Sequence, residues 1–241
     1  TLLGQNVNSY GKTLEEDINF SGLLRKINAI EGDFRIRFMT SHPKDCTEEL
    51  LYTMASCKKV CHQLHLPFQS GNSRVLKAMN RHYDREAYLK LIKKAKELMP
   101  DITLTSDVIV GFPGETYEEF LDTISLVKQV EYNSLFTFIF SPRPNTPAEK
   151  MEDNISRAEK GKWFDELLAV QDEIGKRKQL EMLGLTYRVL CEEKTEKQGV
   201  FTGHTEGNIA VEFEASEADL GKFLNVEITN VNNVLTGTVK E

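Results

Sequence analysis

Short apolar runs alternate with amphipathic stretches over the first two thirds of the chain. The apolar runs have the length and the β-branched and aromatic content of strands. They lie at residues 1–3, 35–39, 63–67, 103–110 and 134–140. Because helical patterns separate them, they predict an α/β fold with a parallel sheet, either doubly wound or curved into a full or partial barrel.

Polar residues and a glycine mark the expected helix boundaries. Thr116 with Glu119, and Ser156 with Glu159, have the spacing of capping boxes, which predicts a helix start at each pair. Apolar residues then recur at helical spacing. These positions are Tyr88, Ile92, Ala95 and Met99 in an earlier run, and Trp163, Leu167, Val170 and Ile174 in a later one. We therefore expect a long second helix that Gly184 ends.

From residue 185 onward the pattern changes to short β-type runs separated by turns. This pattern predicts a small antiparallel β-barrel. We expect three parts: an α/β domain over residues 1–150, a connecting long helix over 151–183 and the barrel over 184–241. Such barrels commonly bind single-stranded or looped RNA, using aromatic rings for the bases and cations for the backbone.

The charge of the chain restricts how it could bind nucleic acid. The 241 residues carry a formal net charge of −7, which argues against binding by bulk electrostatics. Residues 180–241 hold 5 Lys and Arg against 11 Asp and Glu. RNA binding by the barrel would therefore depend on a local face, for which Arg188, Phe201 and His204 are candidates. The same three residues are equally well explained as ordinary barrel positions.

Composition also bears on location. No apolar run is long enough to cross a bilayer, and residues 1–17 lack the regions of a signal peptide. Four cysteines are too few for a disulfide framework in a chain of this length. We therefore expect a cytoplasmic protein that does not contact a membrane. The chain has no initiator methionine and opens on an apolar strand, so we also expect it to start within a domain.

Polar or glycine-rich turns follow four of the predicted strands. They lie at residues 2–6 (LLGQN), 40–43 (TSHP), 65–71 (HLPFQSG) and 106–116 (SDVIVGFPGET). Each has an ordinary explanation as a tight turn. Together they predict one ligand site, because parallel strands bring their carboxyl ends to the same edge of a sheet. The last turn leads into a capped helix, whose free amides suit a carboxylate or a nucleoside edge.

These turns resemble successive blocks of the radical-SAM methylthiotransferases. The matching blocks are LLGQNVNSYG, RFMTSHP, HLPFQSGNSRVLKAMNR, DVIVGFPGET and SPRPNTPAEKM. The first block is more similar to the tRNA-2-methylthio-N6-dimethylallyladenosine synthase branch than to the other branches of this family. The resemblance implies a partial (β/α) barrel of the radical-SAM type, and the last segment resembles a TRAM domain, an OB-like β-barrel that recognises the substrate.

In this family the strand ends hold S-adenosyl-L-methionine (SAM), and the resemblance implies the same here. The matching positions are Gln5, Asn6, Gln69, Ser70, Arg81, Ile109 and Gly111. The Arg81 fork suits the methionyl carboxylate, and the Gln69 amide suits the ribose or the amino group. The backbone around Ile109 would pack against the adenine. Glu115 stands one position later than the glutamate of the commoner radical-SAM pattern, so we assign it no role.

The family also uses two [4Fe-4S] clusters, one on a C-x3-C-x2-C motif and an auxiliary one on three further cysteines. Neither set of cysteines occurs in this chain. Cys57 and Cys61 have C-x3-C spacing, but no third cysteine follows at the required interval, and they precede the third predicted strand instead of following the first. We therefore expect no iron ligand here, identify no catalytic residue, and expect this chain alone to be inactive.

The resemblance implies methylthiolation of N6-isopentenyladenosine next to the anticodon of tRNA. The partners would be the tRNA anticodon loop and an electron donor such as flavodoxin or ferredoxin, and the protein would be a monomer. Within the family, the substrate could instead be threonylcarbamoyladenosine in tRNA or an aspartate of a ribosomal protein. Outside it, the chain could be a non-catalytic RNA-binding module or a SAM- or nucleotide-binding α/β protein without iron.

Overall fold

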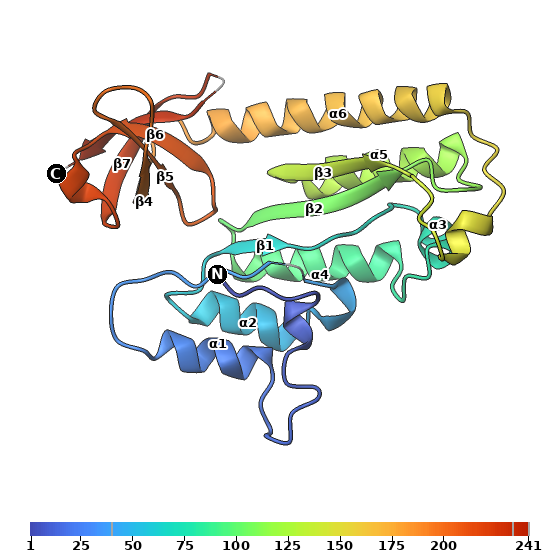
Figure 1. Ribbon diagram of the computed structural model, residues 1–241, viewed down its shortest axis with the longest axis horizontal. Coiled ribbons are helices and arrows are strands. Elements are labelled where there is room, and N and C mark those ends of the chain that lie inside the picture. The colour runs from blue at the N-terminus through green and yellow to red at the C-terminus, as the bar shows by residue number, and fades with distance from the viewer. Residues whose placement is uncertain (40, 233, 241) are drawn as a thin grey trace.

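A parallel sheet forms the centre of the first part of the chain. The computed structural model describes residues 1–39, 41–232 and 234–240. β1 (Gln63–His65), β2 (Thr103–Val110) and β3 (Ser134–Ile139) lie in the order β1-β2-β3, and both pairings are parallel (Figure 1). The expected parallel sheet is confirmed.

The first two expected strands contribute isolated bridges instead of full strands. Leu2 pairs with Phe38, and Ile36 pairs with Val60, both in the parallel sense. These contacts continue the sheet beyond β1 with only a few main-chain hydrogen bonds. β1 ends two residues earlier than the pattern predicts. Thr40, which opens the second of the four turns, lies outside the described residues.

In the described part of the chain, six α-helices accompany the sheet. They are α1 (Phe20–Asn28), α2 (Glu48–Ser56), α3 (Ser73–Ala78), α4 (Arg85–Leu98), α5 (Tyr117–Val130) and α6 (Arg157–Leu180). Both expected capping boxes are present, at Thr116 with Glu119 and at Ser156 with Glu159. Among the described residues, no helix combines the length and the apolar composition that crossing a membrane requires.

The helices bury one face of the sheet. Val108 of β2 belongs to the same apolar core as Ile92 of α4 and Phe120 of α5. Two tyrosines complete this core: the Tyr132 hydroxyl donates to the Tyr88 hydroxyl at 2.8 Å, and that hydroxyl donates to a main-chain carbonyl at 2.9 Å. Both buried hydroxyls are therefore paired, as burial of polar groups requires.

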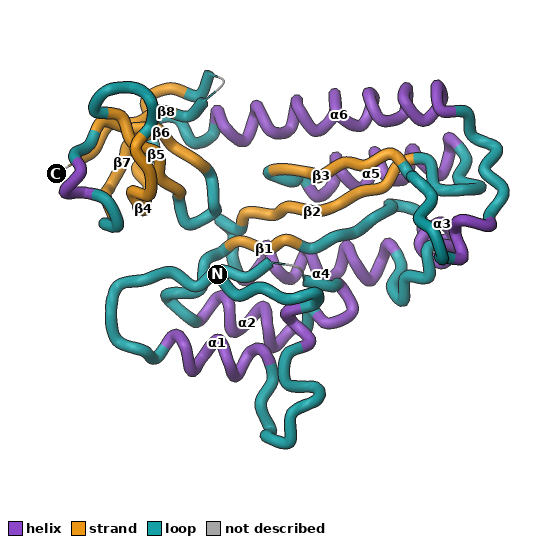
Figure 2. Tube along the Cα trace, viewed as in Figure 1, coloured by secondary structure: helices purple, strands orange, loops and turns teal. Residues whose placement is uncertain are grey.

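Helix α6 runs along the sheet and carries the chain to the barrel (Figure 2). Trp163 and Leu167 are buried in the core of the sheet, and the Trp163 ring stacks on Phe120 with centroids 5.4 Å apart. The helix ends at Leu180, earlier than expected. Gly184 lies in the following turn with a left-handed φ of 78° and donates its N–H to a carbonyl of the barrel. Gly184 therefore joins the helix to the barrel instead of ending the helix.

The C-terminal part is a closed five-stranded barrel with its own core. Its strands are β4 (Thr186–Lys194), β5 (Val200–His204), β6 (Ala210–Glu214), β7 (Phe223–Asn230) and β8 (Thr236–Lys240). They close in the order β4-β5-β6-β8-β7. The expected barrel is confirmed, with one correction: β6 and β8 are parallel. An odd number of strands in a closed ring cannot all be antiparallel to both neighbours.

The domain boundaries expected at residues 150 and 183 stay predictions.

Two arginines hold the barrel against the amino-terminal ends of the parallel strands. Arg35 and Arg37 each donate to two main-chain carbonyls of the barrel. The acceptors are the carbonyls of Arg188, His204, Thr205 and Glu206. The approach is close, since a Cβ atom at Gly207 would lie 2.1 Å from the Thr103 hydroxyl. The barrel thus occupies one end of the sheet and leaves the carboxyl ends of the strands free of it (Figure 1).

Replacement of Arg37 by alanine should loosen this junction. Arg37 also donates to the Gln63 side chain at 2.8 Å, so the change leaves several acceptors without their donor. We expect the free energy of unfolding to fall by about 2–4 kcal/mol, since hydrogen bonds to charged groups contribute about 1.5–3 kcal/mol each. Amide exchange at residues 204–207 should accelerate. Lys93→Ala, on an exposed face of α4, is the control and should change stability by less than about 0.5 kcal/mol. Unchanged exchange in Arg37→Ala would contradict this account of the junction.

Candidate functional site

The third and fourth turns are joined by main-chain hydrogen bonds at the carboxyl edge of the sheet. Gln69 has a left-handed φ of 65° and is 8% exposed. Its N–H donates to the Asp107 carbonyl, and its own carbonyl accepts from the Ile109 N–H, both at 2.9 Å. Two of the residues predicted to hold SAM, Gln69 and Ile109, are therefore direct neighbours.

Arg81 places a donor without a partner beside the second turn. Its Nε–H is buried and has no acceptor among the described residues. Burial, followed by the nearby charge of Arg81, lowers the pKa of His42. The His42 ring in turn meets the Tyr83 ring edge-to-face, with centroids 5.8 Å apart. The Tyr83 hydroxyl also donates to the carbonyls of Pro67 and Phe68, so the second and third turns meet beside Arg81. A buried cationic donor that lacks an acceptor among the described residues fits a carboxylate such as that of SAM.

Asn8 ties the first turn to the second. Its Nδ2 donates to the His42 carbonyl, and its Oδ1 accepts from the His42 N–H, both at 3.2 Å. Nearby, the Asn6 Nδ2 donates to Asp45 at 2.5 Å, while the Asn6 Oδ1 is buried without a partner in the described part of the chain. Gln5 is exposed. The sequence analysis did not single out Asn8, although it stands within the first block.

Glu115 closes the fourth turn from within. Its Oε2 accepts from the N–H groups of Gly111 at 2.8 Å and Phe112 at 3.1 Å. The side chain is 4% exposed, and this burial raises its pKa to about 7, against the effect of the two N–H donors. The sequence analysis gave Glu115 no role. The structure gives it a structural one, because it fixes the turn in which Gly111 has a left-handed φ of 72°.

Lys160 of α6 covers the same turn. A Cβ atom at Gly111 would lie 2.6 Å from the Lys160 Cγ, so only glycine fits there. Lys160 is buried, pairs with Asp153, and its ammonium lies 5.4 Å from the centroid of the Phe140 ring. Lys160 was not among the residues predicted from the sequence. Its position three residues before Trp163 could have indicated that Lys160 is buried, because this spacing puts both side chains on one face of the helix.

Ser70 is fully buried, and its hydroxyl makes a hydrogen bond within the protein. The Oγ accepts from the Asn72 N–H at 3.2 Å. The Asn72 side chain in turn caps α3. The hydroxyl thus orders the start of α3, and contact of Ser70 with SAM stays a prediction.

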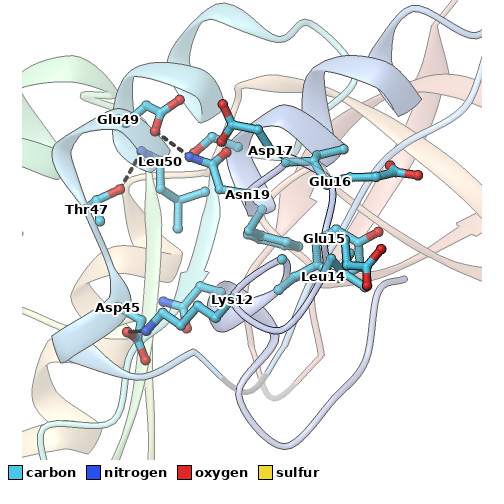
Figure 3. Close-up of a pocket in the computed structure, with 16 residues that line it drawn as sticks. Lys12, Leu14, Glu15, Glu16, Asp17, Asn19, Asp45, Thr47, Glu49 and Leu50 are labelled. Atoms are coloured by element: carbon cyan, nitrogen blue, oxygen red, sulfur yellow. Dashed lines mark hydrogen bonds and ion pairs between the residues drawn. The ribbon is translucent and has the colours of Figure 1, made fainter.

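A pocket lies beside the first turn, on the side of α1 and α2 (Figure 3). Its acidic side chains are Glu15, Glu16, Asp17, Asp45 and Glu49. Lys12 pairs with Asp45 inside it. None of the residues predicted to hold SAM lines this pocket. We therefore place the candidate site at the strand ends and not in the pocket.

The four cysteines are dispersed and buried. Cys46, Cys57, Cys61 and Cys191 are all free thiols. Burial raises the pKa of Cys46 to about 12 and also raises that of Cys61. In the described ranges, no three His, Cys, Asp or Glu side chains come together as a metal site. The residues present therefore do not fit an iron–sulfur cluster.

The structure corrects one of the three barrel residues considered for RNA. Phe201 is 2% exposed, because it points into the barrel core from β5, so its ring cannot stack on a base. Arg188 lies at the junction with the sheet and pairs with Asp33. His204 pairs with Glu192. Of these three candidates, Arg188 and His204 have side chains at the surface and Phe201 does not.

Comparison with known proteins decides the family. The model of the radical SAM superfamily matches residues 3–127, which include residues 3–6 of the first strand-end turn and the whole of the other three. The chain belongs to the radical SAM superfamily. A model of the TRAM domain matches residues 180–240, which include the whole barrel. Membership of the radical SAM superfamily implies use of SAM and of an iron–sulfur cluster.

The radical SAM chain is similar to several curated proteins that carry one name, tRNA-2-methylthio-N(6)-dimethylallyladenosine synthase. The protein of Clostridium perfringens strain SM101 is 51% identical over 229 residues, covering 95% of this chain and 51% of that protein. That of Acetivibrio thermocellus is 49% identical over 233 residues, covering 96% of this chain and 48% of that protein. The chain thus spans about half the length of the curated relatives it matches.

A solved structure supports the fold of the radical SAM chain. Coproporphyrinogen III oxidase (HemN) from Escherichia coli superposes with a TM-score of 0.52 at 17% identity, over 77% of this chain and 50% of that one. At this identity the likeness concerns the fold alone. It confirms the expected radical-SAM type of fold for the first part of the chain.

The raised pKa of Glu115 predicts a pH-dependent stability. With a folded pKa of about 7 against an ordinary 4.5, the carboxyl is ionised in the unfolded chain but protonated in the folded protein between these values, so folding takes up a proton. The contribution of Glu115 to the free energy of unfolding is therefore complete below about pH 4.5. It is lost as the pH rises to about 7, and the loss is at most about 3 kcal/mol. Glu115→Gln keeps an acceptor for both N–H groups and should remove this loss. Urea unfolding of the full-length protein at about pH 5 and pH 8 measures it.

Glu118→Gln is the matched control for this measurement. Glu118 is exposed in the first turn of α5, three residues along the chain from Glu115. It should retain the pH dependence of the wild-type protein. If Glu115→Gln and the wild-type protein lose the same stability between the two pH values, Glu115 does not titrate in this range.

Proposed function

We propose that the full-length protein carrying this chain is a tRNA methylthiotransferase that converts N6-isopentenyladenosine, next to the anticodon, to its 2-methylthio form. The observation that carries the proposal is the identity of about half of all positions to relatives of that name over nearly the whole of this chain. The geometry of the strand ends supports it, because the turns that resemble SAM-binding blocks converge at one edge of the sheet.

In this proposal, the side chains and main-chain groups of the strand ends hold SAM. Arg81 binds the methionyl carboxylate through its unpaired Nε–H. The amide of Gln69 binds the amino group or the ribose, and Asn6 accepts a further donor through its free Oδ1. The backbone from Ile109 to Gly111, fixed by Glu115, packs against the adenine. These groups orient SAM and exclude water, and none of them supplies the radical chemistry.

The iron chemistry would come from parts of the protein outside this chain. We propose two [4Fe-4S] clusters, held by cysteines that this chain does not provide. Such clusters would supply the radical and sulfur-transfer chemistry, which no residue of this chain provides. A flavodoxin or a ferredoxin would supply the electrons.

The tRNA anticodon loop would approach along the junction of the barrel and the sheet. Arg188 and His204 lie at this junction, and the Arg188–Asp33 ion pair and the His204–Glu192 contact are partly exposed. Exposed pairs of this kind contribute little to stability, so a phosphate can replace the carboxylate at small cost. The protein would act as a monomer in the cytoplasm, where its tRNA substrate is found.

Arg81→Lys tests the assignment of SAM binding. Lysine keeps the charge but loses the Nε–H and the planar fork, so the KM for SAM should rise about 10- to 100-fold. The measurement is formation of 2-methylthio-N6-isopentenyladenosine by reconstituted full-length protein on undermodified tRNA. Lys77→Ala, an exposed cation of α3, is the control and should leave the KM unchanged. An unchanged KM in Arg81→Lys would contradict the role of Arg81. Absence of product from the wild-type protein would contradict the proposed function.

A further inference from the structure

Among the described residues, no helix covers the second face of the parallel sheet, which carries two exposed phenyl rings. Side chains alternate along strands, so the residues that oppose the buried face share this one. We call it the open face and define it by His65, Thr105, Asp107, Phe136 and Phe138. Register places Phe136 beside Asp107, and Phe138 beside Ile109. Phe136 is 50% exposed and Phe138 is 53% exposed. Adjacent exposed aromatic rings on a sheet are unusual and indicate a binding surface.

A fixed polar group adjoins these rings. His65 is buried, and its Nδ1 lies 3.0 Å from the Thr105 hydroxyl. Its Nε2 lies 3.4 Å from the Asp107 carboxylate, so both ring nitrogens have partners. The His65 ring also meets Phe136 edge-to-face, with centroids 5.8 Å apart. The open face therefore combines the two phenyl rings with the partly exposed carboxylate of Asp107, which the contact with His65 holds in place.

The open face lies between the two functional regions. At one end the barrel docks on Arg37 and Thr103. At the other end Ile109, which neighbours Phe138 in the sheet, is hydrogen-bonded to Gln69. The open face thus connects the barrel with the strand ends.

We propose that Phe136 and Phe138 form the wall that receives the target adenine and its apolar N6 substituent, and thereby set the preference for an isopentenyl group. The proposal rests on the proposed function and extends it. Aromatic side chains stack on bases, and burial of an alkenyl chain against phenyl rings is favourable. The Asp107 carboxylate disfavours an anionic substituent such as threonylcarbamoyl at the same place, because like charges repel in a partly buried site.

The test uses full-length protein and anticodon stem-loop RNAs that differ only in the target base. The bases are adenosine, N6-isopentenyladenosine and N6-threonylcarbamoyladenosine. Dissociation constants are measured by fluorescence anisotropy at one fixed salt concentration. Wild-type protein should bind the isopentenyl RNA at least about fivefold more tightly than either other RNA, in line with the effect of one stacked or buried group.

Phe136→Ala and Phe138→Ala should each reduce this preference at least about threefold, with little change in binding of the adenosine RNA. Phe138→Tyr keeps the ring and should retain the preference. Tyr52→Ala removes a ring of similar exposure from the outer side of α2 and is the control. Because both phenylalanines are half exposed, the variants should melt at the wild-type temperature, which thermal unfolding checks.

Three outcomes would overturn the inference. The wild-type protein could bind the three RNAs equally, the alanine variants could retain the full preference, or they could weaken binding of all three RNAs by the same factor. Failure of the proposed function is seen separately. In that case wild-type protein binds the isopentenyl RNA but, when reconstituted and supplied with SAM and reductant, forms no methylthio product from it.

Discussion

The parallel register of β1, β2 and β3 is the constraint on which the rest of the structure depends. Parallel strands send all their carboxyl ends to one edge and all their amino ends to the other. The two edges consequently have separate tasks: one carries the converging turns, and the other receives the barrel through Arg35 and Arg37. The same pairing turns one face toward the helices and leaves Phe136 and Phe138 exposed on the opposite face.

The candidate site is also where the chain departs from ordinary structural rules. Gln69 has a left-handed backbone without being glycine, and Arg81 buries a donor that has no acceptor in the described part of the chain. Glu115 and Lys160 are buried ionisable groups on either side of the Gly111 turn. Each feature costs stability in the isolated fold, and such costs concentrate where a protein binds or reacts. Their convergence at one edge favours a ligand that supplies the missing partners.

The sequence predicted the elements whose signals are local. Both capping boxes, β2 and the barrel follow from spacing and alternation, and the structure contains them. The strands expected near Leu2 and Phe38 are only bridges, because strand pairing depends on neighbours far along the chain. Asn8 and the open face were not predicted for the same reason, and Glu115 was considered but given no role, because its contacts with Gly111 and Phe112 do not follow from motif spacing. Phe201 was left open between an RNA contact and an ordinary barrel position, because alternation alone does not say which side of a closed barrel is inside; its burial favours the second.

The central claim is that the complete protein methylthiolates isopentenyladenosine in tRNA, and nucleoside analysis in cells tests it most directly. Transfer RNA from cells with and without the full-length gene is digested and measured by mass spectrometry. The account predicts that 2-methylthio-N6-isopentenyladenosine disappears on deletion while N6-isopentenyladenosine accumulates. An unchanged level of the methylthio nucleoside, or loss of the methylthio form of threonylcarbamoyladenosine instead, would contradict it.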